Sequence, residues 1–90
     1  MSTLAPELHT LLNQQINEEM SASYSYLAMS AWFEDTPYGG FAQWMLAQSQ
    51  EETLHAMKFY HFLIDRSAKI ELTEIKAPRS DYAHPLEVFE

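Results

Sequence analysis

The chain has 90 residues, of which 13 are acidic, 5 are basic and none is a cysteine. Its formal net charge is -8 at pH 7. A single domain of this size without disulfides needs a metal ion or a partner subunit for stability, and its acidic balance favours cations over nucleic acid. With no leader segment and no apolar run long enough to cross a membrane, we expect a cytoplasmic protein without a membrane partner.

Two long helices are predicted in the first three quarters of the chain. Between about Pro6 and Asp35 there is neither glycine nor internal proline, and strong helix formers dominate. The stretch DTPYGG, residues 35–40, holds a proline and both glycines of the chain, a composition typical of a tight turn. A second helix is expected from about Gly40 to Ser67. Residues 1–68 are therefore predicted to form an antiparallel helical hairpin.

Residues 69–90 form a C-terminal tail of different character. The stretch KIELTEIKAPRSDYAHPLEVFE contains Pro78 and Pro85, which interrupt regular structure. Apolar and polar residues alternate only weakly near its start. We expect an extended arm with one helical turn near Leu86.

The apolar residues of both helices recur in steps of four and three, and ionisable residues occupy some of these positions. On the first helix this spacing joins Leu12, Ile16, Glu19, Ser23, Tyr26 and Ser30. On the second helix it joins Phe41, Met45, Gln48, Glu52, His55, Phe59 and Phe62. Glu19, Glu52 and His55 are therefore expected to point where the apolar side chains point.

These apolar stripes are wider than two helices can cover between themselves. They are flanked by further apolar side chains, namely Leu8, Leu27, Trp32, Trp44 and Leu63. A two-helix hairpin has no interior, so a second hairpin is expected to bury them. The predicted fold is all-α, with two chains pairing into a four-helix bundle.

The spacing Glu-x-x-His of Glu52 and His55 aims both side chains at one point beside the helix. A lone carboxylate in such a core is costly, and Glu19 on the facing helix can complete a carboxylate-and-imidazole group. Bundles with di-iron carboxylate sites use one glutamate from each of two helices and Glu-x-x-His from each of the others. One chain thus supplies half of a two-metal centre, and two chains supply four carboxylates that balance two divalent ions. Iron, manganese and zinc all suit these ligands.

At these residues the chain resembles the ferritin family, in particular bacterial non-haem ferritin and bacterioferritin. The resemblance runs through LLNQQINEEMSASYSYLAMSAWFED, GGFAQWMLAQSQEETLHAMKFYHFL and EIKAPRSDYAHPLEVF. It covers nearly all of this chain but only the first half of the family's usual chain. It implies that Glu19, Glu52 and His55 are ferroxidase-centre ligands, that Glu52 bridges two irons, and that Tyr26 is the tyrosine beside the centre. Tyr26 also fits plain core packing.

The sequence departs from the family's pattern at three places. The third and fourth helices are missing, so the sequence is either a fragment of a ferritin or a minimal ferritin. We expect the second, in which an identical subunit completes the bundle around a twofold axis. Thr53 stands where bacterioferritins carry the methionine that ligates haem, so haem is not expected. Of the accessory third iron site only Glu51 remains as a candidate ligand.

The resemblance implies a ferroxidase that oxidises two ferrous ions with dioxygen or hydrogen peroxide and stores ferric iron in a homo-oligomeric shell of dimers. One alternative is a di-iron peroxidase of the rubrerythrin kind that stores no iron, although the cysteine-ligated domain usual in those proteins is absent. Another is a metal-free helical assembly module. Glu19 and Glu52, on the apolar seams, argue against that module.

Overall fold

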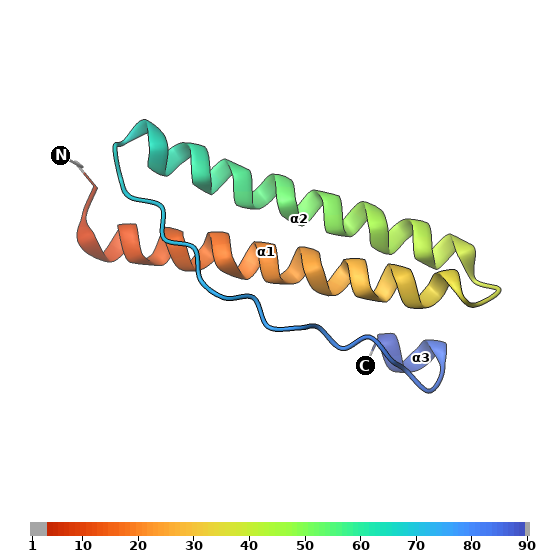
Figure 1. Ribbon diagram of the computed structural model, residues 1–90. Coiled ribbons are helices and arrows are strands. Elements are labelled where there is room, and N and C mark those ends of the chain that lie inside the picture. The colour runs from red at the N-terminus through yellow and green to blue at the C-terminus, as the bar shows by residue number, and fades with distance from the viewer. Residues whose placement is uncertain (1–3, 90) are drawn as a thin grey trace.

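A computed structural model of the protein describes residues 4–89 and contains three helices, α1 (Pro6–Glu34), α2 (Gly39–Asp65) and α3 (Pro85–Val88). Helices α1 and α2 run antiparallel, side by side along their whole lengths, and form an elongated hairpin (Figure 1). The predicted all-α fold is confirmed, and each predicted helix end lies within two residues of the observed one. Among the described residues, no helix is long and apolar enough to span a bilayer.

Local signals explain where the two long helices begin and end. Pro6 stands at the first position of α1, where its missing N–H costs nothing. In the turn, the Thr36 hydroxyl donates to the Phe33 carbonyl at 2.7 Å. Helix α2 ends where Ser67 adopts a left-handed φ of 56° and the Ala68 N–H donates to the Leu63 carbonyl at 2.9 Å, a helix-terminating pattern.

The contact between α1 and α2 is made of small side chains in its middle and larger ones at its ends. Helix α2 buries Ala42, Met45, Ser49, Ala56 and Leu63. Most of these buried residues lie one position after a residue of the seam predicted for α2. The hairpin's own interface is thus rotated by one residue, about 100°, from that seam. The predicted seam of α2, which includes Glu52 and His55, therefore borders a face of the hairpin that the contact between α1 and α2 leaves uncovered. This face is called the open face below.

That open face carries the surplus of apolar surface expected from the sequence. Leu8, Leu27 and Trp44 are 40%, 45% and 51% exposed. Phe41, three turns before Glu52 on α2, is also exposed. Leu63 differs, because α1 and the start of the tail bury it completely.

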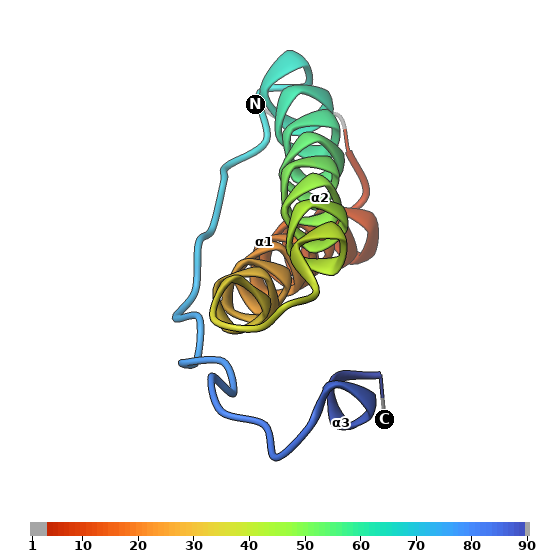
Figure 2. The same ribbon diagram turned by 90° about the vertical axis from the view of Figure 1, so that its right-hand side faces the viewer.

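The tail is extended until its short final helix, as predicted. Its extended part lies on one side of the hairpin and α3 lies beneath the hairpin on the other side (Figure 2). Asn13 of α1 accepts a hydrogen bond from the Glu71 N–H at 2.8 Å and donates to the Lys69 carbonyl at 3.0 Å. One turn later, Asn17 accepts from the Thr73 N–H at 2.9 Å. The side chains of Asn13 and Asn17 thus hold the backbone of the tail against α1.

Helix α3 is held against the turn end of the hairpin by aromatic contacts. The Phe89 ring lies 6.1 Å from that of Phe33, which is fully buried, and Tyr82 lies 5.5 Å from Trp32. Arg79 forms an ion pair with Glu87. The tail therefore crosses from the outer side of α1 to the open face.

Candidate metal centre

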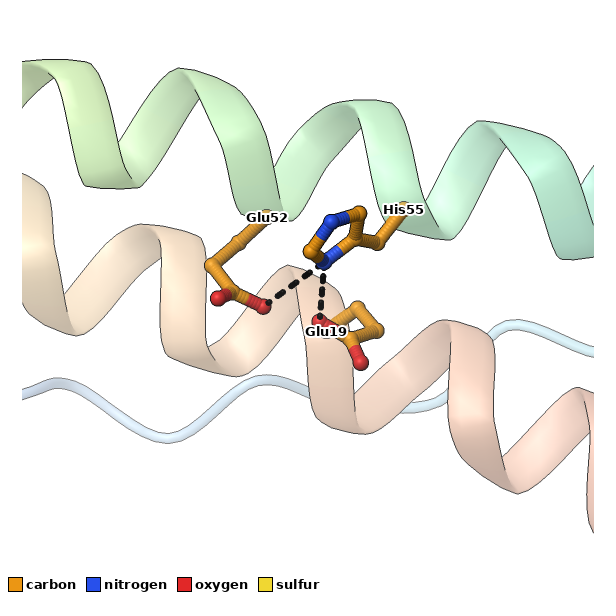
Figure 3. Close-up of side chains that lie close together, drawn as sticks. All are labelled: Glu19, Glu52 and His55. Carbon is orange, nitrogen blue, oxygen red and sulfur yellow. Dashed lines mark ion pairs between the residues drawn. The ribbon is translucent and has the colours of Figure 1, made fainter.

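Three of the predicted ligands come together between the middles of α1 and α2. Glu19, Glu52 and His55 each offer one ligand atom, and these atoms all lie within 4.8 Å of one another. The His55 Nδ1 atom is 3.6 Å from a Glu19 carboxylate oxygen and 3.7 Å from a Glu52 oxygen (Figure 3). Ligand atoms that share one metal ion at about 2.1 Å lie roughly 3 to 4 Å apart, so the cluster fits a cation.

The helices place this cluster at the centre of the open face. Helix α1 has 29 residues and α2 has 27, and Glu19 and Glu52 stand at or next to the middle of each. The side chains of Glu19 and Glu52 are 17% and 21% exposed, while that of His55 is 44% exposed. In Figure 3 the three side chains face the viewer and the tail passes behind α1. The side opposite the tail is therefore where a ligand or a partner reaches the cluster.

The two carboxyl groups titrate as a pair. The hydrogen bond with Glu52 lowers the pKa of Glu19, and hydrogen bonds from Gln15 and the neighbouring His55 lower it further against the opposing effect of burial. The same hydrogen bond raises the pKa of Glu52, and burial and the Glu19 charge add to the rise. Glu52 therefore keeps its proton to a higher pH than Glu19 does, and a bound cation would compete with that proton.

The donor set suits a transition metal. Two carboxylates and an imidazole are ligands for iron, manganese or zinc. One chain offers three such side chains, which is half of the set that di-iron carboxylate bundles use. Gln15 adds support, since its side-chain N–H donates to the other Glu19 oxygen at 2.9 Å and holds that carboxylate in place.

The remaining predicted site residues lie around this cluster. Tyr26, two turns beyond Glu19, is half-buried and packs edge-on against Trp44, with ring centroids 6.5 Å apart. Glu51 is exposed and lines a pocket with His55 outside the three-residue cluster. The roles assigned to Tyr26 and Glu51 stay predictions.

The sequence reasoning missed a group of hydroxyls beside the cluster. Ser23, Ser49 and Thr53 hydrogen-bond to one another across the helix contact, one turn or less from the glutamates. A signal was available: serine occupies seam positions of α1 where a larger apolar residue would be usual. Thr53 therefore faces Ser23, away from the open face.

The chain is similar to known proteins along nearly its whole length. The family model for the ferritin-like domain matches residues 9–90. The chain is 39% identical to the bacterial non-heme ferritin of Staphylococcus saprophyticus over 87 residues, which cover 97% of this chain and 52% of that protein. It is 38% identical over 86 residues to that of Staphylococcus epidermidis, with 96% and 52% covered. The chain spans about half the length of the curated relatives it matches.

Solved ferritin structures share its fold. An open-pore ferritin from the hyperthermophilic archaeon Archaeoglobus fulgidus superposes with a TM-score of 0.89 at 36% identity, over 99% of this chain and 54% of that one. A humanized archaeal ferritin gives a TM-score of 0.91 at 39% identity, over 97% and 53%. With two long antiparallel helices that carry Glu19 and Glu-x-x-His at their centres, the chain belongs to the ferritin family.

Proposed function

We propose that two copies of this chain pair to complete a di-iron centre, that this centre oxidises ferrous iron, and that paired chains assemble into a shell that stores the product. The observation that carries the proposal is the cluster of Glu19, Glu52 and His55 on an open face. It is half of a known ligand set, and a twofold axis beside it supplies the other half.

The position of the cluster favours pairing of identical chains. Because Glu19 and Glu52 stand at the helix centres, a twofold axis there lays the turn end of one hairpin over the open end of its partner. Both helices are then covered along their lengths. The partner chain then buries the exposed side chains of Leu8, Phe41 and Trp44. The end of the tail around α3 already covers Phe33.

The residues of the paired site have distinct tasks. Glu19, Glu52 and His55 of both chains hold two ferrous ions, and the bound ions compete with the proton that the raised pKa of Glu52 favours. Four carboxylates then balance four positive charges. Each ferrous ion gives up one electron, and the two electrons convert hydrogen peroxide to two hydroxide ions, or dioxygen and two protons to hydrogen peroxide. Holding both irons together supplies both electrons in one encounter and avoids a radical product.

Storage is the second part of the proposal, and the ferritin relatives support it. Oxidised iron leaves the centre for the interior of a homo-oligomeric shell, and the formal charge of -8 per chain attracts incoming cations. Haem is not part of this proposal, because Thr53 stands where bacterioferritins carry the methionine that ligates haem. We place the protein in the cytoplasm.

The test is native mass spectrometry with metal analysis after aerobic loading with ferrous iron. We expect about two irons per pair of chains at low loading, with rapid colour development, and many more per particle at high loading. Glu52→Gln should abolish the fast phase, while the neighbouring Glu51→Gln, which removes the same charge outside the cluster, should keep it. A small particle that stops at two irons would favour the peroxidase alternative. A chain that binds no iron would contradict the proposal.

A further inference from the structure

We propose that Ser23, Ser49 and Thr53 are positioning residues that set α1 against α2, and so set the distance between the Glu19 carboxylate and its partners on α2. This inference rests on the proposed function, because it concerns the same centre. It assigns a role to a buried hydroxyl cluster between the two helices, which the metal ligands do not include.

The hydrogen bonds of this cluster are reciprocal. The Ser23 hydroxyl donates to the Ser49 carbonyl at 2.8 Å, and the Ser49 hydroxyl donates to the Ser23 carbonyl at 2.7 Å. The Thr53 hydroxyl lies 2.8 Å from the Ser23 hydroxyl, where either oxygen can donate, and it also donates to the Ser49 carbonyl at 3.2 Å. Every hydroxyl of the cluster therefore has a partner on the other helix.

Such a pattern exists in one register of the helices only. A helix rises about 1.5 Å per residue, and a hydrogen bond tolerates a donor–acceptor distance only between roughly 2.7 and 3.2 Å. A slip of one residue would break both reciprocal bonds. Apolar contacts are not directional and tolerate such a slip far better. The serine pair therefore fixes the register of α1 against α2, which the apolar contacts alone do not fix.

The cluster lies directly beside the proposed ligands. Ser23 is one turn beyond Glu19 on α1, Ser49 is one turn before Glu52 on α2, and Thr53 follows Glu52. Ser23 and Ser49 are only 9% and 6% exposed, so water does not replace a lost bond easily. A shift here moves Glu19 relative to α2 without touching any ligand.

The chain contains its own matched control. The Ser30 hydroxyl donates to the Ala42 carbonyl of α2 at 2.7 Å and is also buried, at 4% exposure. It makes the same kind of bond between the same helices. It lies about 16 Å from Glu19 along α1, against about 6 Å for Ser23, at the turn end of the hairpin.

The experiment titrates Co(II), as a coloured stand-in for Fe(II), into the full chain and into Ser23→Ala and Ser30→Ala. We expect Ser23→Ala to bind Co(II) at least about tenfold more weakly and with a shifted visible spectrum, as when second-layer contacts of a metal site are removed. Ser30→Ala should keep both the affinity and the spectrum while losing similar thermal stability. Equal affinities in all three proteins, or equal losses in both variants, would overturn the inference.

A second pair of variants protects the test against misfolding. Thr53→Val keeps the shape of the side chain and removes its hydroxyl, and Thr53→Ser keeps the hydroxyl. Weakened binding in Thr53→Val that Thr53→Ser restores would support a positioning role, and equal binding in both would contradict it. If the unaltered chain bound no Co(II), the proposed function would fail together with this inference. Normal binding in all variants would refute the inference alone.

Discussion

Glu19 of α1 and Glu52 of α2 shift each other's pKa in opposite directions: the hydrogen bond between them lowers the pKa of Glu19 and raises the pKa of Glu52. The two residues come from different helices, so the largest cause of each shift requires that α1 and α2 pack together. The metal-free chain therefore contains an acidic pair that is strained whenever both carboxylates are charged.

Glu52→Gln should stabilise the metal-free chain at neutral pH while it abolishes metal binding. The raised pKa of Glu52 means that the folded state holds this proton more tightly than the unfolded state does, so the ionised residue destabilises the fold as the pH rises through that pKa. Removing the repulsion should raise the free energy of unfolding by about 0.5 kcal/mol. Urea unfolding at several pH values checks this. The gain should vanish at acid pH, where Glu52 is protonated, and Glu51→Gln should show no such pattern.

Metal binding should release protons and weaken as the pH falls. A cation competes with the proton that Glu52 holds above its ordinary pKa, so acid favours the metal-free form. Isothermal titration of Co(II) in buffers of different ionisation enthalpy measures the protons released. We expect more release near the raised pKa of Glu52 than at high pH, where the pair is already ionised. A proton count of zero throughout would contradict the raised pKa of Glu52.

Trp44→Glu should separate paired chains. Trp44 is 51% exposed on the open face, so a charge there costs the isolated hairpin little but becomes buried and unpaired in a dimer. Sedimentation equilibrium should show a dimer for the unaltered chain and a monomer for the variant, with iron oxidation slowed at least about tenfold. The control is Leu72→Glu in the tail, where Leu72 is 73% exposed. A Trp44→Glu protein that remained dimeric would place the interface elsewhere.

Tyr26→Phe should slow iron oxidation and leave iron binding unchanged. Tyr26 lies two turns beyond Glu19 and keeps its ring contact with Trp44 in either form, so packing is preserved. Only the hydroxyl, the group that can donate an electron and a proton, is lost. Stopped-flow absorbance after ferrous loading should give a rate several-fold lower at the same stoichiometry. An unchanged rate would assign Tyr26 to plain packing.

Asn13→Ala should release the tail from α1. Asn13 binds the tail backbone through its carbonyl and its amide group, at Glu71 and Lys69. Losing these bonds should cost about 1 to 2 kcal/mol of local stability. Hydrogen exchange at the Glu71 amide should then accelerate. Gln14→Ala, which alters an exposed neighbour on the same helix, should leave that exchange unchanged.

Much of this protein could be read from its sequence because its largest features are local. Helix formers without glycine or proline define α1 and α2, and the prolines define the tail, since these preferences act over a few residues. The helical period also placed Glu19 on one seam and the pair Glu52 and His55 on the other. Those three residues do come together in the fold.

Only the tertiary structure decided which apolar face the hairpin uses for itself. Both faces are apolar, so the period of the sequence alone does not rank them. Small residues such as Ser49 and Ala56 let the helices approach closely, and this leaves the bulky Phe41 and Trp44 on the open face.

The same holds for the contacts between distant residues. Three features join residues far apart in the chain: the binding of the tail by Asn13, the reciprocal bonds of Ser23 and Ser49, and the opposite pKa shifts that Glu19 and Glu52 cause in each other. Hydrogen bonds need partners at fixed distances and angles. Those distances exist only once α1, α2 and the tail have packed together.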